Sequence, residues 1–263
     1  MKAALSKLRR ELRLLKREGQ HLMKDCGIGE AFISALEGLR PKSCVEIGAG
    51  LGFLTRFIRR SCSNVIAVEL DLRLLPYLKG YVSDLLNVHI VGGDGLHIIS
   101  GGHLCDTIVS NTPYKITGPL IAGIVKSAAK AAAIMVQQEV ADRLTSPPGD
   151  RKYGRLTAFV NSFMSVERVR TFPPESFFPR PKVNSTLIVL KRFREWSPSM
   201  LGYERFLRDL FTQRRKVLGK VLRETFHCVK TDVADDIRKL RVYQLSPPQL
   251  LKIYDDLLRS GKC

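Results

Sequence analysis

The chain has 263 residues, and its 43 lysines and arginines outnumber its 25 aspartates and glutamates, which gives a formal net charge of +18. With 44% hydrophobic residues it has the composition of a globular protein with one large domain or one domain plus a small appendage, and no apolar run approaches the roughly 20 residues of a membrane span. The positive charge is spread over several segments, which favours a nucleic acid as the partner over an anionic lipid or a role in solubility alone.

The six cysteines are scattered without a Cys-x-x-Cys pair, and the five histidines show no metal-ligand spacing. We therefore expect neither a metal site nor a redox dithiol. The start of the chain does not have the pattern of a secretory signal peptide, so we expect buried thiols in a cytoplasmic protein. The motifs of serine hydrolases and P-loop nucleotide hydrolases are also missing from the sequence.

Leucines at helical spacing among basic residues predict an amphipathic helix over residues 1–18. A mitochondrial presequence has a similar pattern, but Glu11 and Glu18 argue against it because such segments are poor in acidic residues. We expect this basic helix to lie on the catalytic domain near the substrate.

Strand patterns alternate with helical patterns along the next part of the chain. Helices are predicted over 31–39 and 53–58 and from about residue 155, and strands over 44–47, 65–69, 88–91, 106–110, 133–137, 166–169 and 183–191. Such alternation predicts an α/β fold with a mostly parallel, seven-stranded sheet. From about residue 195 the pattern is helical only, so we predict a catalytic domain over 1–194 and a helical domain over 195–263.

A glycine-rich turn, Gly48-Ala49-Gly50-Leu51-Gly52, joins the first strand to a helix. The dinucleotide fingerprint requires a third glycine where this chain has Phe53, so a ligand without pyrophosphate is favoured. Glu69 ends the second strand, where an acid can bind both ribose hydroxyls, and Asp94 follows the third, where it can accept from an adenine amine. An acid after a strand is usually a cap or a turn residue. The glycine-rich turn, Glu69 and Asp94 nevertheless follow three successive strands, and together they predict a pocket for S-adenosylmethionine. Gln20 is expected to close this pocket.

The stretch Asn111-Thr112-Pro113-Tyr114 follows the fourth strand. Its plainest interpretation is a turn. If an adenosine cofactor lies beside this stretch, we predict that the stretch is a clamp for a flat ring with an amino group. The Asn111 side chain and the Thr112 carbonyl then accept hydrogen bonds from the amine, and Pro113 orients that carbonyl. Tyr114 stacks on the ring. Phe177 is expected to stack on the other face, although both Phe177 and Phe178 are also candidates for the core.

Nearly the whole chain, in order, resembles the KsgA-type ribosomal RNA adenine dimethyltransferases. The matching segments are 19–22, 46–52, Glu69, Asp94, 111–114, 137–144, 153–157, 177–185 and 211–216. The resemblance implies a Rossmann-like class I methyltransferase fold with a small all-helical C-terminal domain. It also implies transfer of two methyl groups from S-adenosylmethionine to N6 of each of two adjacent adenosines near the 3′ end of small-subunit rRNA, coupled to ribosome biogenesis. Three positions depart from the family's usual residues: Thr112 stands where leucine is usual, Ala49 where proline is frequent, and His21-Leu22-Met23 where Asn/His-Phe-Leu is usual.

These patterns and the resemblance together give the expected site residues. The catalytic residues are Asn111, Thr112, Pro113, Tyr114 and Phe177. The cofactor-binding residues are Gln20, Leu22, Glu46, Gly48, Gly50, Glu69, Leu70, Asp94, Gly95 and Asn111. The RNA-binding residues are Arg180, Lys182, Arg214, Arg215, Lys216, Lys220 and Arg223.

The sequence leaves two other functions open. The relatives that methylate large-subunit rRNA and confer macrolide resistance (Erm type) share the clamp, and a ribosome-assembly factor with little catalysis would also bind rRNA. We expect residues 213–216, Lys220 and Arg223 to form a basic face on a C-terminal helix, for which a merely solvated face is the alternative. The expected partner is small-subunit rRNA or its precursor particle, bound by a monomer without a metal and away from membranes.

Overall fold

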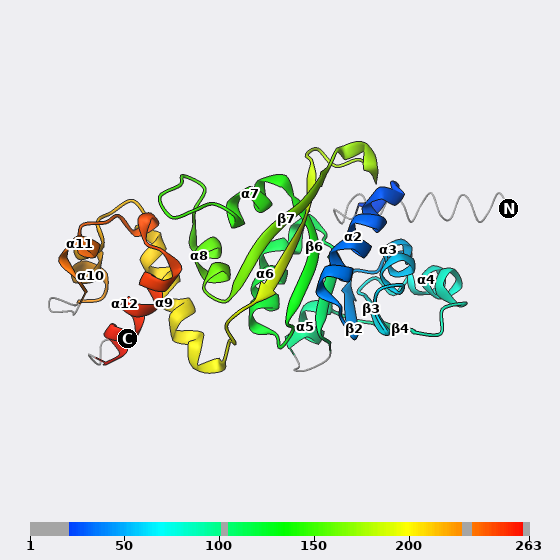
Figure 1. The fold of residues 1–263 in the computed structure, drawn as a ribbon, viewed down its shortest axis with the longest axis horizontal. Helices are drawn as coiled ribbons and strands as arrows, with labels where there is room; N and C mark the ends of the chain where they lie inside the picture. The colour runs from blue at the N-terminus through cyan, green and yellow to red at the C-terminus, as the bar shows by residue number, and fades with distance from the viewer. Residues whose placement is uncertain (1–20, 101–104, 228–232, 260–263) are drawn as a thin grey trace. The chain divides into compact units, whose positions relative to one another are not determined.

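The computed structural model describes residues 21–100, 105–227 and 233–259. The predicted basic helix over 1–18 and Gln20 therefore lie outside the described residues. The chain divides into two compact units (Figure 1). The first holds the described residues of 1–141 and 166–192, and the second those of 142–165 and 193–263.

A seven-stranded sheet is the framework of the first unit. Its strands are β2 (Ser43–Ile47), β3 (Asn64–Glu69), β4 (Val88–Gly92), β5 (Thr107–Asn111), β6 (Ala131–Gln137), β7 (Met164–Phe172) and β9 (Ser185–Arg192). They are arranged in the order β4-β3-β2-β5-β6-β9-β7. The first five are parallel neighbours and β9 runs antiparallel to β6. This mostly parallel sheet confirms the predicted fold class, and every predicted strand is present with shifted ends.

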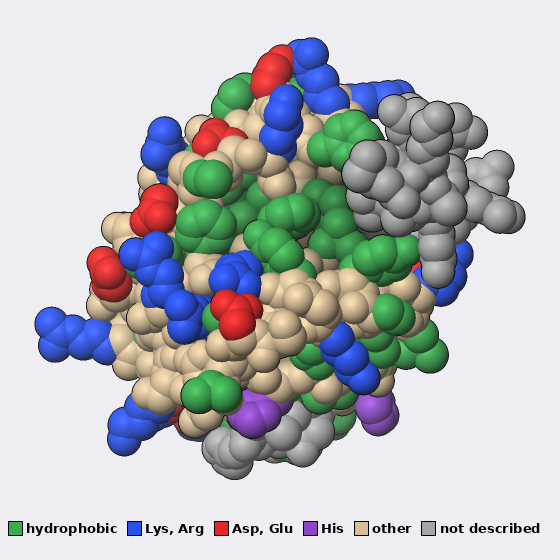
Figure 2. All heavy atoms as spheres, turned by 90° about the vertical axis from the view of Figure 1, so that its right-hand side faces the viewer, with side chains coloured by type: hydrophobic (Ala, Val, Ile, Leu, Met, Phe, Trp, Pro, Cys, Tyr) green, Lys and Arg blue, Asp and Glu red, His purple; other side chains and the backbone are tan. Residues whose placement is uncertain are grey.

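Helices cover both faces of the sheet (Figure 1). On one face, α2 (Cys26–Leu39), α3 (Phe53–Ile58) and α4 (Leu75–Val82) bury their apolar sides against strand residues such as Val65 and Val109. On the other face α5 (Gly95–Ser100) packs with α6 (Thr117–Lys126), and Gly95 lies against Ile47. Figure 2 views the side that carries α3 and α4, where hydrophobic side chains also reach the surface around a hollow.

A second, two-stranded sheet was not predicted. β1 (Leu22–Met23) pairs antiparallel with β8 (Phe177–Phe178), with Leu22 opposite Phe178 and Met23 opposite Phe177. Strands of two residues are too short to show an alternating pattern, so only the folded chain reveals them. This pairing brings the start of the described chain to the predicted stacking residues.

The second unit is helical and differs from the predicted C-terminal domain in one segment. It contains α8 (Arg155–Asn161), α9 (Leu201–Thr212), α10 (Leu218–Thr225), α11 (Asp235–Arg238) and α12 (Pro247–Arg259), and α7 (Gln138–Leu144) spans the division. Residues 142–165 belong to this unit because their side chains complete its core. The Tyr153 hydroxyl donates to the Leu245 carbonyl at 3.0 Å, and Ser162 Oγ lies 2.8 Å from the hydroxyl of Tyr203. The second segment of this unit starts at Phe193, two residues before the predicted start of the helical domain at residue 195.

The cysteines correct one expectation. Cys44 and Cys62 were expected to be thiols, but a disulfide joins them, because the start of β2 and the segment after α3 lie side by side with their Cα atoms 6.2 Å apart. Cys26 and Cys105 are free, and Cys26 is exposed rather than buried. Among the described residues, no helix has the length and apolar content needed to cross a lipid bilayer.

Candidate active site

The site residues lie where four neighbouring parallel strands end. β2, β3, β4 and β5 point the same way, so their carboxyl ends meet at one edge of the sheet. The next residues along the chain are Gly48, Leu70, Gly93 and Thr112, and Glu69 and Asn111 are themselves the last residues of their strands. The parallel register thus brings together residues up to 64 positions apart in the sequence, Gly48 and Thr112.

The glycine loop after β2 takes a backbone conformation that other residues rarely adopt. Gly48, Gly50 and Gly52 have φ angles of 78°, 58° and 86°, and Gly52 is the N-cap residue of α3. The N–H groups of Gly48 and Ala49 both donate to the Val68 carbonyl at 2.9 Å, which ties the loop to β3. The absence of Cβ atoms leaves this backbone open to close approach by a ligand.

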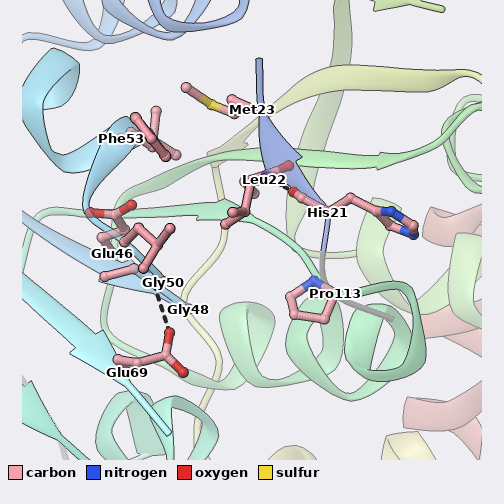
Figure 3. Close-up of a pocket in the computed structure, with 13 residues that line it drawn as sticks. His21, Leu22, Met23, Glu46, Gly48, Gly50, Phe53, Glu69 and Pro113 are labelled. Carbon is pink, nitrogen blue, oxygen red and sulfur yellow. Dashed lines mark hydrogen bonds between the residues drawn. The ribbon is translucent and has the colours of Figure 1, made fainter. Parts of the chain in front are cut away.

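Glu69 links the glycine loop to the end of β3. Its side chain is only 1% exposed, yet both carboxylate oxygens are bonded: Oε2 accepts from Gly50 N at 2.7 Å and Oε1 from Asp71 N at 2.8 Å (Figure 3). Burial raises the pKa of Glu69 above its usual value, and these backbone donors oppose that shift. Each carboxylate oxygen can accept a further hydrogen bond, which suits a pair of ribose hydroxyls.

Glu46 places a second buried carboxyl group in the same pocket. It is also 1% exposed, and Thr55 Oγ1 donates to its Oε2 at 2.6 Å. Burial, with a smaller contribution from the charge of Glu69, raises the pKa of Glu46 to about 8, although the Thr55 hydrogen bond lowers it. Glu46 is therefore largely protonated at neutral pH in this structure.

A cavity of about 390 Å³ opens beside Glu69. Five predicted cofactor residues line it: Gly48, Glu69, Leu70, Asp94 and Gly95. One oxygen of Asp94 accepts from Leu96 N at 2.9 Å, so Asp94 caps the turn after β4 and keeps its other oxygen as an acceptor. The mostly apolar wall suits a flat ring system, and the acids at its rim suit amino and hydroxyl donors.

A smaller cavity of about 30 Å³ adjoins the larger one and is also lined by the glycine loop (Figure 3). It shares Gly48, Glu69 and Pro113 with the larger cavity. The remaining predicted cofactor residues among the described ones line it: Leu22, Glu46, Gly50 and Asn111. Leu22 comes from β1, and its Cδ2 atom would lie 3.4 Å from a Cβ built on Gly50. The structure thus brings every described residue of the predicted cofactor set to one or both cavities.

Asn111 is held at the mouth of the smaller cavity. Its Nδ2 donates to the His21 carbonyl at 2.7 Å, which fixes the orientation of the amide and leaves Oδ1 as its acceptor. Thr112 is buried, and its backbone N–H donates to the Met135 carbonyl at 3.3 Å. Pro113 has φ −57° and ψ 128°, which ends the extended chain before a short 3-10 turn over Tyr114–Ile116.

Two contacts hold the Tyr114 side chain, one through its hydroxyl and one through its ring. Its hydroxyl lies 2.7 Å from Ser185 Oγ, and its ring centroid lies 5.1 Å from that of His21. Burial raises the pKa of Tyr114 above its usual value, with the Ser185 hydrogen bond opposing the shift, so the hydroxyl stays neutral. A fixed neutral ring beside Asn111 is the arrangement that a stacking platform requires.

Phe177 does not reach this pocket. Its side chain is 3% exposed and packs in the hydrophobic core with Met23 and Ile28, whereas Phe178 is 50% exposed. The reason is the register of β8 with β1: neighbouring residues of a strand face opposite sides, and here Phe177 faces the core. Phe177, the ring predicted to stack on the substrate base, is thus buried in this structure.

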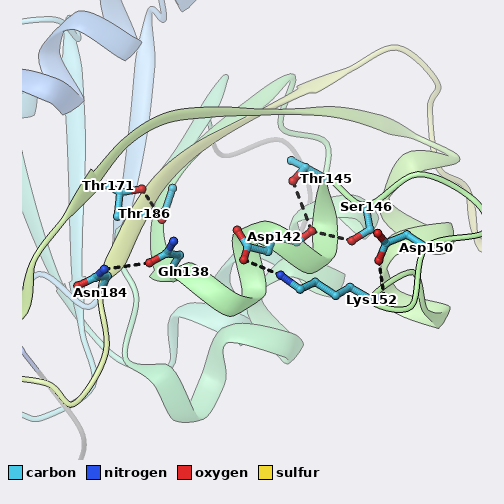
Figure 4. A network of polar contacts seen from close by, with 9 residues as sticks. All are labelled: Gln138, Asp142, Thr145, Ser146, Asp150, Lys152, Thr171, Asn184 and Thr186. Carbon is cyan, nitrogen blue, oxygen red and sulfur yellow. Dashed lines mark hydrogen bonds and ion pairs between the residues drawn. The ribbon is translucent and has the colours of Figure 1, made fainter.

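Polar contacts hold two further segments that match the family pattern, 137–144 and 177–185 (Figure 4). At the end of β6, Asn184 Nδ2 donates to Gln138 Oε1 at 3.0 Å. Separately, within the second unit, Lys152 Nζ lies 2.8 Å from Asp142 Oδ2, and Ser146 Oγ donates to the Asp142 carbonyl at 2.7 Å. These residues are bonded to one another, which indicates a structural role for both segments.

The predicted RNA-binding residues fall in both units. In the first unit Lys182 is exposed and Arg180 forms an ion pair with Glu175. In the second unit residues 213–216 do not continue a helix as expected but form the turn between α9 and α10, because α9 ends at Thr212 and Val217 bridges to Arg241.

The predicted basic side chains of this turn and of α10 differ in their surroundings. Arg214 is held by the Arg151 carbonyl at 2.8 Å and lies over the ring of Tyr243, so it supports the fold of the unit. Lys216 and Lys220 both approach Glu224, at 3.4 and 3.6 Å. Arg215 and Arg223 are exposed, and these two are the side chains best placed to reach a phosphate.

Three residues that complete the site were not singled out from the sequence. His21 bonds Asn111 through its carbonyl, Ser185 bonds Tyr114, and Thr55 bonds Glu46. His21 and Ser185 lie within segments that match the family pattern, which was the available signal. Thr55 had none. Among the described residues, no group of three or more histidine, cysteine, aspartate or glutamate side chains is placed to hold a metal ion.

Comparisons with known proteins show which sequences and folds this chain resembles. The profile of the family described as Ribosomal RNA adenine dimethylase matches residues 13–257. Ribosomal RNA small subunit methyltransferase A of Thermotoga maritima is 34% identical over 257 residues, which cover 96% of this chain and 88% of that protein. A solved dimethyladenosine transferase from Plasmodium falciparum has a TM-score of 0.78 at 25% identity, covering 92% of this chain and 99% of that one. The solved 23S rRNA methyltransferase ErmE shares the fold, with a TM-score of 0.68 at 24% identity and coverage of 90% and 99%.

The raised pKa of Glu46 predicts how stability changes with pH. Its folded pKa of about 8 lies above the usual 4.5, so between these values the folded state holds a proton that the unfolded chain has released. The contribution is complete below pH 4.5 and is lost as the pH rises through 8, at up to about 1.4 kcal/mol per pH unit. Glu46→Gln, which cannot titrate, should therefore show a smaller fall in the free energy of unfolding than the unaltered protein, measured by urea unfolding from pH 5 to 8.

The matched control is Glu37→Gln, an exposed carboxylate on α2. It should leave the pH dependence unchanged. Equal slopes for Glu46→Gln and the unaltered protein would contradict the predicted protonation of Glu46.

Proposed function

The chain belongs to the ribosomal RNA adenine dimethylase family, and on this basis we propose that it transfers methyl groups from S-adenosylmethionine to N6 of two adjacent adenosines near the 3′ end of small-subunit rRNA. The observation that carries the proposal is the position of Asn111. Its amide is fixed by His21, and it lies in the wall of a cavity that also contains Glu69. A polar acceptor for an amino group is thus held beside a pocket suited to an adenosine.

The residues at the strand ends fit the proposed cofactor. The larger cavity has room for an adenine ring, Asp94 keeps an acceptor at its edge, and Glu69 keeps acceptor capacity for both ribose hydroxyls. The backbone of Gly48 and Gly50 permits close approach to the rest of the cofactor. S-adenosylmethionine would supply a methyl group on a sulfonium sulfur, which is a good leaving arrangement.

The clamp supplies orientation rather than acid or base chemistry. The lone pair of N6 is delocalised into the adenine ring, and acceptors at Asn111 Oδ1 and the Thr112 carbonyl favour the tetrahedral nitrogen of the transition state. Alignment of the two reactants can lower the barrier by roughly 7–11 kcal/mol. The Tyr114 ring, fixed by Ser185, would add about 1–3 kcal/mol of stacking for a base extruded from its helix.

Two alternatives are less well supported. ErmE shares the fold at 24% identity, whereas the 34% identical relative that covers 96% of this chain is named for the small subunit. A purely structural assembly factor would not need Asn111, Glu69 and Glu46 gathered in one pocket. The net charge of +18 supports a substrate of rRNA, free or in a precursor particle, which the protein would meet in the cytoplasm.

Replacing Asn111 by alanine tests the clamp. Removal of one fixed hydrogen-bonding group from a transition state typically slows catalysis by about 10²–10³-fold. We expect Asn111→Ala to lower methyl incorporation into unmethylated small-subunit rRNA by at least this factor, with an unchanged circular dichroism spectrum. The control is Asn64→Ala, at the exposed opposite end of β3, which should retain activity. Full activity of Asn111→Ala would refute the role of the clamp.

Replacing Glu69 by alanine tests the cofactor pocket. Loss of one hydrogen bond to a charged group costs about 1.5–3 kcal/mol, so we expect Glu69→Ala, which removes the partner of both ribose hydroxyls, to weaken S-adenosylmethionine binding by at least roughly 10–100-fold. Isothermal titration calorimetry measures the change, with Glu37→Ala as the exposed control. An unchanged dissociation constant would remove Glu69 from the cofactor site.

Neutralising exposed cations of the second unit tests the proposed rRNA contacts. Each phosphate contact that is lost should reduce the slope of log K against log salt by about 1. We expect a variant with Arg215, Lys216 and Arg223 changed to glutamine to bind rRNA more weakly and with a smaller slope. A variant with Arg205, Lys252 and Arg259 changed to glutamine has the same net charge and serves as the control. Identical slopes for the two variants would place the rRNA elsewhere.

A further inference from the structure

A cavity of about 520 Å³ on the first unit has no part in the transfer described above. Three of the side chains that line it are large rings that remain exposed: Phe53 at 37%, Tyr81 at 42% and Phe178 at 50%. They come from α3, α4 and β8, and we call the surface that they form the aromatic groove. Figure 2 shows the hydrophobic side chains around a hollow on this side of the molecule, with lysines and arginines beside them. Exposed apolar surface gathered around a hollow marks a binding surface more often than a random arrangement does.

The rings are held in place, and a cation lies on one of them. Phe53 and Tyr81 meet edge to face with their centroids 5.1 Å apart. The Arg56 guanidinium lies 5.2 Å from the centre of the Tyr81 ring and is fixed by Asp84 at 2.7 Å. Lys24 is exposed and also lines the groove. The groove therefore offers flat apolar faces, with Lys24 among its lining residues and the Arg56–Asp84 ion pair beside Tyr81.

The groove adjoins the candidate active site. Leu22, Met23, Leu51 and Phe53 line both the groove and the smaller cavity that contains Asn111 and Glu69. Figure 3 shows Met23 and Phe53 at the same end of that cavity. A single layer of side chains thus separates the proposed methyl-transfer site from the aromatic groove.

We propose that the aromatic groove binds an unpaired nucleobase of the substrate rRNA that neighbours the adenosine being methylated. This inference rests on the proposed function. When a base leaves its stack, its neighbour loses a stacking partner, and exposed rings next to the site replace that contact. The exposed Lys24 that lines the groove suits the phosphate that joins the two nucleotides.

The charges beside the groove are balanced, so the choice of a nucleobase as its occupant rests on the flat rings and on the lining residues shared with the candidate active site. Asp25 also lines the groove, but its carboxylate accepts from Gly27 N at 2.8 Å and from Ser176 Oγ at 3.3 Å, so it is committed to capping α2. Its charge nevertheless offsets that of Lys24, and Arg56, which does not line the groove, is paired with Asp84, so the groove has no net charge of its own in a chain of net charge +18.

Fluorescence of a modified RNA tests the proposal. A short RNA with the target adenosine and 2-aminopurine at the neighbouring position is bound to the full-length protein, and stacking on a ring quenches the probe. Loss of one stacking ring corresponds to about 5–150-fold weaker binding. We expect Tyr81→Ala and Phe178→Ala to weaken binding by such a factor and to reduce quenching, while Tyr81→Phe keeps both. In methylation assays the two alanine variants should raise KM for RNA.

Two controls remove rings outside the groove. Tyr77→Ala lies one turn earlier on α4, and Phe193→Ala removes an exposed ring of the second unit. Both should bind and quench like the unaltered protein. Unchanged affinity and quenching in Tyr81→Ala and Phe178→Ala would overturn the proposal. Lower thermal stability of these variants with unchanged RNA affinity would also overturn it, because that result would mean that another part of the chain covers the groove. Absence of methyl transfer by the unaltered protein would instead overturn the proposed function.

Discussion

The hydrogen bond from Gly50 N to Glu69 Oε2 joins the loop after β2 to the end of β3, and the pocket depends on it. A carboxylate that is 1% exposed must be bonded, because an unpaired buried charge is costly. The Gly50 N–H reaches it only through a positive φ, which glycine adopts without strain. Glu46, buried nearby, adds a second carboxyl group whose pKa is raised. A positively charged sulfonium cofactor would lower both pKa values, so the pocket is electrostatically matched to the cofactor proposed for it.

Much of this site could be predicted from the sequence because the relevant geometry is that of the backbone. Once strands alternate with helices, a parallel sheet follows, and the residues after each strand share one edge. Gly48, Glu69, Asp94 and Asn111 meet there without any knowledge of how side chains pack. The predicted strand over 106–110 ended one residue early, since β5 includes Asn111. That shift matters chemically, because the proposed acceptor belongs to the rigid sheet and not to the following turn.

The features that could not be predicted all depend on tertiary contacts. β1 and β8 have two residues each, and their register alone decides that Phe177 enters the core while Phe178 faces outward. The basic residues after α9 form a turn because Val217 bridges to Arg241, a partner distant in the sequence. Residues 142–165 join the helical unit through buried contacts such as Tyr153 with Leu245. The disulfide between Cys44 and Cys62 likewise reflects proximity in the fold, which cysteine spacing does not reveal.

The segment at His21 connects the parts of the site into one assembly. Its carbonyl accepts from Asn111, its ring lies against Tyr114, and its Nδ1 donates to the Pro179 carbonyl at 2.6 Å. Pro179 follows Phe178, whose strand partner Leu22 lies against the glycine loop. A nucleobase seated on Phe178 would therefore hold β8, and through His21 it would also restrain the amide of Asn111. Because alignment is the main contribution proposed for the clamp, a substrate that steadies both ends of this connection would favour transfer to its own amino group over transfer to water.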